Sequence, residues 1–116
     1  MGPAENSFAA YVLGQLAPLR GLGCRAMFGG YGLYRGPTFF GIIFAGQLYF
    51  KTDETTVEDY LRHGTRPFQP NATQVLRTYY EVPTAILEDR ERLLDWAAVA
   101  AQCAAAASER PQRISR

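Results

Sequence analysis

At 116 residues, the chain is long enough for one compact domain and too short for two of ordinary size. Its 47% of hydrophobic residues, against 20% charged, excludes a chain too polar to fold, and its formal net charge of +1 excludes a strong overall attraction to nucleic acid. The two cysteines, Cys24 and Cys103, lack CxxC spacing, and the sequence shows neither a signal-peptide pattern nor an apolar run of membrane-spanning length. We therefore expect a reduced, cytoplasmic protein with one core.

A first helix is predicted near the N-terminus. Asn6 or Ser7 can cap it, and apolar residues then recur at helical spacing as far as Leu19. Pro18 marks its end, because the residue before a proline is disfavoured in the helical conformation.

Four strands are predicted after this helix, separated by short turns that contain glycine. The third is apolar almost throughout, which favours a central position or cover on both faces. The fourth alternates, with Leu48 and Phe50 on one face and Tyr49 and Lys51 on the other. We expect these strands to form an antiparallel meander, and they lie at residues 24–28, 31–35, 38–44 and 48–51.

The rest of the chain predicts a helix, a late hairpin and a final helix. Thr52 or Asp53 can cap a helix of about three turns. Extended segments at 66–68 and 75–82 flank a hairpin turn that lacks the glycine expected there. Asp89 is a good N-cap for the last helix, whose alanine-rich run suits close packing. The predicted fold class is α+β, an antiparallel sheet (meander plus late hairpin) flanked by an N-terminal, a middle and a C-terminal helix.

Glycines are concentrated between the first two predicted strands, where a plain strand would not favour them. One interpretation is structural: Gly29, Gly30 and Gly32 permit an unusual backbone path between the strands. The neighbours expected to fill the core are Met27, Phe28 and Leu33.

The other interpretation of this segment is a recognition surface that the glycines shape. Tyrosine and arginine are the residue types that dominate binding energy at protein interfaces. The candidate partner surface consists of Tyr31, Tyr34, Arg35, Tyr49 and Lys51. A phosphate-binding loop is excluded, because the GxxxxGK[ST] spacing is missing and a strand, not a helix, is predicted to follow.

No catalytic, cofactor-binding or metal-ligating residue is predicted. Cys24 would need a base beside it to act as a nucleophile, and the single histidine, His63, is predicted on another element. Cys103 has the setting of a small buried helix residue, and His63 suits the end of a helix. A small enzyme that uses Cys24 or His63 is therefore the third-ranked hypothesis for the function, after a protein-binding module and a nucleic-acid-binding domain.

Direct nucleic-acid binding is the second-ranked hypothesis for the function. Basic and tyrosine side chains on the predicted strands could contact phosphates and stack on bases, but the near-neutral charge argues against strong non-specific affinity. The residues concerned are Arg20, Arg25, Arg35 and Lys51 with Tyr31, Tyr34 and Tyr49.

Five motifs occur in a fixed order along the chain. They are MFGGYG at 27–32, LYFKTD at 48–53, PF at 67–68, YYEVP at 79–83 and LDWA at 94–97. Together they resemble the N-terminal domain of the TfoX/Sxy competence regulators, and their joint occurrence is more specific than any one of them. The resemblance implies an α+β fold with helices flanking an antiparallel sheet, and a role in regulating DNA-uptake genes or in another bacterial process.

Two-domain members of that family carry a second, C-terminal domain, whereas this chain ends soon after its last predicted helix. We therefore expect a stand-alone copy, with one domain at 8–104 and flexible termini at 1–7 and 109–116. The preferred function is a non-enzymatic regulatory module that binds protein, with the transcription machinery as one candidate partner and without a membrane role. A homodimer is a further alternative, through an exposed sheet edge or the alanine-rich last helix.

Overall fold

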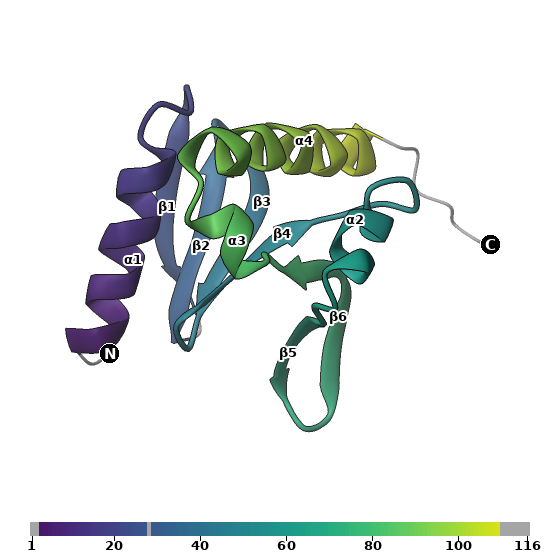
Figure 1. The fold of residues 1–116 in the computed structure, drawn as a ribbon, viewed down its shortest axis with the longest axis horizontal. Coiled ribbons are helices and arrows are strands. Elements are labelled where there is room, and N and C mark those ends of the chain that lie inside the picture. The colour runs from purple at the N-terminus through teal and green to yellow at the C-terminus, as the bar shows by residue number, and fades with distance from the viewer. Residues whose placement is uncertain (1–2, 28, 110–116) are drawn as a thin grey trace.

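The computed structural model describes residues 3–27 and 29–109, which form an antiparallel sheet with helices packed against it (Figure 1). The predicted α+β fold class is confirmed. In chain order the elements are α1 (Pro3–Leu16), β1 (Leu22–Met27), β2 (Gly30–Arg35), β3 (Thr38–Phe44), β4 (Gln47–Lys51), α2 (Val57–Arg62), β5 (Pro67–Asn71), β6 (Gln74–Glu81), α3 (Thr84–Leu87) and α4 (Arg90–Glu109).

The sheet joins the predicted meander to the predicted hairpin. Its strand order is β1-β2-β3-β4-β6-β5, so the hairpin enters through its second strand and β1 and β5 form the two edges. Figure 1 shows the β5–β6 hairpin projecting away from α4. The apolar strand β3 is internal, as predicted, and its residues from Phe40 to Ile43 are buried.

The last helix crosses the sheet and carries much of the core. Asp89 caps it as predicted, because its Oδ1 atom accepts a hydrogen bond from the Arg92 N–H at 3.2 Å. The small alanine side chains let the helix approach the strands closely, which brings their apolar atoms into contact. The helix residues buried in the core include Leu93, Ala97, Ala100, Ala101 and Ala104.

The first helix begins at Pro3, earlier than the predicted caps at Asn6 or Ser7, and it ends at Leu16, before Pro18. It packs beside α4, where the Arg90 Nη2 atom donates to the Gly14 carbonyl at 3.0 Å. Of the segments expected to be flexible, residues 1–2 and 110–116 lie outside the described residues. Phe28, which was predicted to fill the core, also lies outside them.

The middle helix, α2, is shorter than predicted. It has six residues instead of about three turns, because side chains close a separate turn before it. The Asp53 N–H donates to Thr56 Oγ1 at 3.0 Å, and the Thr56 N–H donates to Asp53 Oδ1 at 3.0 Å. This reciprocal pair satisfies N–H groups that a helix leaves without partners at its start, so Asp53 caps the turn at 53–56 and the regular helix begins only at Val57.

The hairpin turn dispenses with the glycine that the sequence led us to expect. Asn71 Oδ1 accepts hydrogen bonds from the N–H groups of Thr73 and Gln74, both at 3.0 Å. An asparagine side chain that bonds the backbone two and three residues later forms a turn of its own.

A bulge in β3 decides which side chains reach each face of the sheet. Leu33 pairs with Gly41, whereas the next residue, Tyr34, pairs with Phe39, so Phe40 is an extra residue in β3. Phe40 is therefore buried in the core together with Ile43, while Phe39 and Ile42 lie on the opposite side.

Candidate functional site

The sheet has a core face, against which the helices pack, and an opposite face that we call the outer face. Side chains of directly paired residues lie on the same face. Leu33, Leu48 and Phe50 belong to the core. The pairs on the outer face include Tyr34 with Phe39, Tyr49 with Glu81, and Lys51 with Tyr79.

The structure divides the five residues of the candidate partner surface between the two faces. Tyr34, Tyr49 and Lys51 lie on the outer face, and the predicted alternation of β4 is confirmed. Tyr31 packs against the core cluster, and Arg35, also on the core face, donates from Nε to the Arg20 carbonyl at 3.1 Å. Tyr31 and Tyr34 are three residues apart in one strand, so they point to opposite sides of the sheet.

Three rings on the outer face form a continuous group, which we call the aromatic row: Tyr34, Phe39 and Tyr79. The Tyr34 and Phe39 centroids are 5.3 Å apart, and those of Phe39 and Tyr79 are 5.5 Å apart, both in tilted geometry. All three side chains are half-buried. Burial, with a smaller contribution from Tyr34, raises the pKa of Tyr79 to about 12, because the packed surroundings disfavour the charged tyrosinate.

A basic side chain lies at each end of the aromatic row. The guanidinium carbon of Arg25 is 5.1 Å from the Tyr34 ring centroid, and Lys51 Nζ is 5.4 Å from that of Tyr79. Both distances are within the range of cation–π attraction. The row is thus an apolar, aromatic strip with positive charge at both ends.

Tyr49 belongs to a second aromatic group on the outer face. Its ring centroid is 4.7 Å from that of Phe68, which is 5.4 Å from that of Phe44. Phe68 is fully buried, so this group anchors the hairpin strand β5 to the sheet. Burial and the nearby Glu81 carboxylate raise the pKa of Tyr49.

The three glycines that were predicted to shape this region have different reasons to be glycine. Gly29 has φ of +83°, a left-handed conformation that favours glycine. At Gly30, a Cβ atom would collide with the Ile43 carbonyl oxygen of β3. At Gly32, a Cβ atom would lie 2.5 Å from Met27 Sδ and 2.9 Å from Phe39 Cε1. Gly32 therefore leaves room for side chains that close over the outer face.

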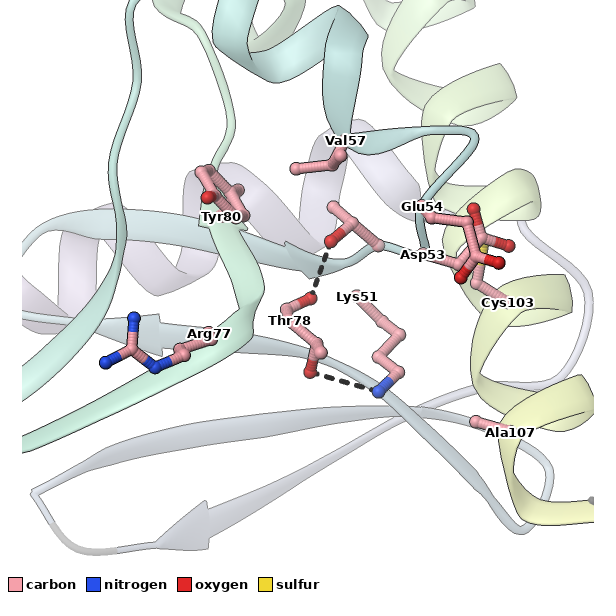
Figure 2. A pocket seen from close by; sticks show the side chains of 10 residues that line it. Lys51, Asp53, Glu54, Val57, Arg77, Thr78, Tyr80, Cys103 and Ala107 are labelled. Atoms are coloured by element: carbon pink, nitrogen blue, oxygen red, sulfur yellow. Dashed lines mark hydrogen bonds between the residues drawn. The ribbon is translucent and has the colours of Figure 1, made fainter.

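A cleft of about 360 Å³ opens where β4 and β6 meet the turn before α2 and the end of α4. Figure 2 shows Lys51 and Thr78 side by side, Asp53 and Cys103 together on the helix side, and Arg77 pointing away from Lys51. Lys51 Nζ donates to Thr78 Oγ1 at 3.0 Å, and the Thr52 hydroxyl donates to the Thr78 carbonyl at 3.0 Å.

Of the two carboxylates that line this cleft, Asp53 and Glu54, Asp53 is held by structural hydrogen bonds. Asp53 accepts from the hydroxyl and N–H of Thr55, from the N–H of Thr56 and from the Cys103 thiol. These hydrogen bonds, led by the Thr55 hydroxyl, lower the pKa of Asp53 to about 2. Burial raises the pKa of the Cys103 thiol, which favours the neutral S–H over the nucleophilic thiolate.

The structure places Cys24 and His63 in different settings. Cys24 is exposed on the edge strand β1, and partial burial raises its pKa. His63 follows α2, where Nδ1 donates to the Asp59 carbonyl at 2.9 Å and the ring packs edge-on to Trp96. The thiol that does contact a carboxylate is Cys103, which the sequence indicated only as a small buried residue.

Sequence reasoning missed two members of the aromatic row, Phe39 and Tyr79. Phe39 would share a face with Gly41 and Ile43 in an unbroken strand, and the bulge reverses that assignment. Tyr79 joins the row because β6 pairs with β4, a long-range pairing that no local pattern specifies. Gly41 was the available signal, because a glycine inside a strand often marks a bulge.

In residues 3–27 and 29–109, no group of three or more His, Cys, Asp or Glu residues is placed to hold a metal ion. In the same part of the chain, every helix is too short or too polar to cross a membrane.

The chain was also compared with known proteins. None of the curated proteins matches it. Residues 14–104 match the family model described as the TfoX N-terminal domain, over most of the predicted span of 8–104. The chain therefore belongs to the TfoX N-terminal domain family, and with it to a general class of regulatory modules related to competence.

Proposed function

We propose that the protein is a cytoplasmic, non-enzymatic regulatory module that binds a protein partner through the outer face of its sheet. The observation that carries the proposal is the aromatic row, half-exposed, with Arg25 at one end and Lys51 at the other. Membership of the TfoX N-terminal domain family supports a role linked to competence genes, with the transcription machinery as a candidate partner.

The physical basis of this proposal is the composition of the row. Tyrosine and phenylalanine bury a large apolar area for the loss of only two side-chain torsions, and arginine adds hydrogen bonds and ring contacts. The Tyr34 and Phe39 rings already restrain each other in the free protein. Binding of a partner therefore costs little additional side-chain entropy. The cationic ends would favour a partner whose contact surface is acidic at its rim.

The alternative of a catalytic centre is less well supported by the geometry. The one thiol–carboxylate contact, Cys103 with Asp53, places a neutral thiol against a carboxylate that three N–H or O–H groups already occupy. Neither group is arranged as a nucleophile with a base.

An affinity pull-down from native lysate, read by mass spectrometry, tests the proposal. Tyr34→Ala combined with Tyr79→Phe should lower the recovery of specific partners by about tenfold or more, since the Tyr34 ring, which contacts Phe39 and Arg25, and the Tyr79 hydroxyl are lost. Tyr11→Ala is the matched control, because Tyr11 is a 43% exposed tyrosine on α1, away from the sheet's outer face. Identical partner lists for the wild type and the double variant would contradict the proposal.

Nucleic-acid binding is kept as the second candidate because the fold brings part of its predicted set together. Arg25, Tyr34, Tyr49 and Lys51 all lie on the outer face. A salt-dependent mobility shift of labelled DNA, weakened in Arg25→Ala, would favour this function. Unchanged mobility at low salt would eliminate it.

A further inference from the structure

The two edges of the sheet differ in whether another strand can add to them. At one edge, β5 contains Pro67 and Pro70, and its pairing with β6 shifts register twice. Prolines and irregular register are the usual devices that stop an edge from pairing with another chain. At the other edge, β1 contains no proline and pairs with β2 over six residues without a register shift. The β1 edge is therefore built to accept a strand, and the β5 edge is not.

The backbone groups available at the β1 edge can be identified from the pairing. The Gly36 N–H donates to the Gly21 carbonyl at 2.8 Å, one step before the Leu22–Arg35 pair. Bonded pairs alternate along an antiparallel ladder, so the N–H and C=O groups of Cys24 and Ala26 point away from β2. Within the described part of the chain, no segment outside β2 bonds to the backbone of these two residues. Cys24, Arg25 and Ala26 are all exposed.

The charge around this edge specifies the kind of strand that fits. From residue 6 to residue 52, a stretch that includes all of β1 to β4, the sequence has four basic side chains and no acidic one. Arg20 lies just before β1, Arg25 is within it, and Arg35 pairs with its first residue. A second copy of the chain would bring the same positive charge to the interface, whereas an acidic strand would be attracted.

We infer that the β1 edge binds an acidic, extended segment of a protein partner, which adds to the sheet as a seventh strand beside Cys24 and Ala26. This inference rests on the proposed function, because it names the chemistry of the partner that such a module takes. The added strand lies next to Arg25, whose guanidinium also covers Tyr34, so the edge and the aromatic row form one continuous surface. Main-chain hydrogen bonds supply affinity in this mode of recognition, and side chains supply selectivity.

The experiment is a selection of random displayed peptides of about ten residues, long enough for one strand, against the full chain. Recovered peptides should be rich in Asp and Glu. The strongest is then labelled and titrated against variants. Ala26→Pro removes an outward N–H at an edge position that tolerates proline, and Arg25→Glu reverses the charge; each should weaken binding about tenfold or more. Ala26→Val keeps the N–H and is the matched control, with affinity close to that of the wild type.

Amide chemical shifts identify the bound edge independently of the variants. Shifts that move on peptide addition should centre on Cys24 and Ala26, and circular dichroism checks that Ala26→Pro still folds. If the Ala26→Pro variant does not fold, the inference is tested by the affinity of Arg25→Glu and by the residues whose amide shifts move. Selected peptides that are not acidic, or that bind Ala26→Pro as tightly as the wild type, would overturn the inference. So would binding of labelled oligothymidylate at this edge with no acidic peptide selected, which would indicate nucleic acid instead.

Failure of this inference can be told apart from failure of the proposed function. If recovery of a partner falls in the Tyr34 and Tyr79 double variant but not in Ala26→Pro, the proposed binding by the outer face is supported and strand addition at β1 is contradicted. If the same partners are recovered with and without the Tyr34 and Tyr79 substitutions, the proposed function itself is contradicted.

Discussion

The Cys103 thiol donates a hydrogen bond to Asp53 Oδ2 at 3.4 Å, and this contact joins the last helix to the turn before α2. The same carboxylate, through Oδ1, closes that turn with Thr55 and Thr56. One side chain therefore sets where α2 begins and holds α4 against it. The position of the cleft beside Lys51 depends on both contacts.

Acid should weaken this junction in a predictable way. The hydrogen bonds lower the pKa of Asp53 from 3.8 to about 2 in the folded protein. The stability that the ionised group contributes is therefore complete above about pH 4 and is lost as the pH falls through 2. Asp53→Asn keeps an oxygen that can accept the turn hydrogen bonds but removes the charge, so it should lower the free energy of unfolding by about 0.3–1 kcal/mol at neutral pH, as for a charge at a helix N-terminus. The difference in unfolding free energy from the wild type should disappear toward pH 2.

Denaturant unfolding at several pH values measures that difference. Asp95→Asn, an exposed carboxylate on α4, is the control and should leave the pH dependence as it is in the wild type. A gap between wild type and Asp53→Asn that stays constant from pH 7 to pH 2 would show that the Asp53 contacts do not depend on its charge.

The two thiols should react with a chromogenic disulfide reagent at different rates. Cys24 is exposed on β1, whereas Cys103 is buried and bonded to Asp53, and burial raises the pKa of its thiol. Modification of Cys103 requires a local opening of the α4 junction, so it should be at least about tenfold slower than that of Cys24. Cys24→Ser should abolish the fast phase and Cys103→Ala the slow one. A single rate for both thiols would mean that the junction opens readily.

Gly30→Ala should destabilise the fold because the new methyl group meets main chain. Its Cβ would collide with the Ile43 carbonyl oxygen in β3, and neither strand can shift without disturbing the ladder. Overpacking of this kind costs about 1–3 kcal/mol. Gly14→Ala is the matched control: apart from the adjoining residues and backbone of its own helix, nothing lies within 4 Å of the added methyl on α1, and helix propensity predicts a gain of about 0.5–1 kcal/mol. Denaturant unfolding should therefore show a lower free energy of unfolding for Gly30→Ala and a higher one for Gly14→Ala. Equal changes in the two variants would refute the close-approach explanation.

The fold was predictable where local patterns determine it. Alternation placed Leu48 and Phe50 opposite Tyr49 and Lys51, and Pro18 and Asp89 marked helix ends correctly. Strand boundaries were correct to within a few residues, because turns with Gly36 and Gly46 require left-handed backbone that glycine supplies at little cost.

The candidate site was less predictable because it depends on pairing between distant segments. Tyr31 and Tyr34 were grouped by sequence proximity, although the alternation of β2 sends them to opposite faces. Phe39 reaches the outer face only because β3 bulges at Phe40, and Tyr79 reaches it only because β6 pairs with β4. Register and bulges are set by packing of the whole sheet, so single-strand patterns do not determine them.

The buried phenols should make the protein sensitive to alkali, with Tyr79 carrying an identifiable share. Its pKa is raised from 10.0 to about 12 by burial, so the folded state disfavours the tyrosinate. The stability that this contributes is intact below pH 10 and is lost as the pH rises toward 12, because the unfolded chain releases the proton first. Tyr79→Phe should therefore show a smaller loss of unfolding free energy between pH 10 and 12. Burial raises the pKa of Tyr60 further, so part of the loss remains in the variant. Tyr11→Phe, at an exposed position of α1, is the control, and its free energy of unfolding should depend on pH as in the wild type. If Tyr79→Phe also showed the wild-type pH dependence, the Tyr79 hydroxyl would be solvated in the folded protein.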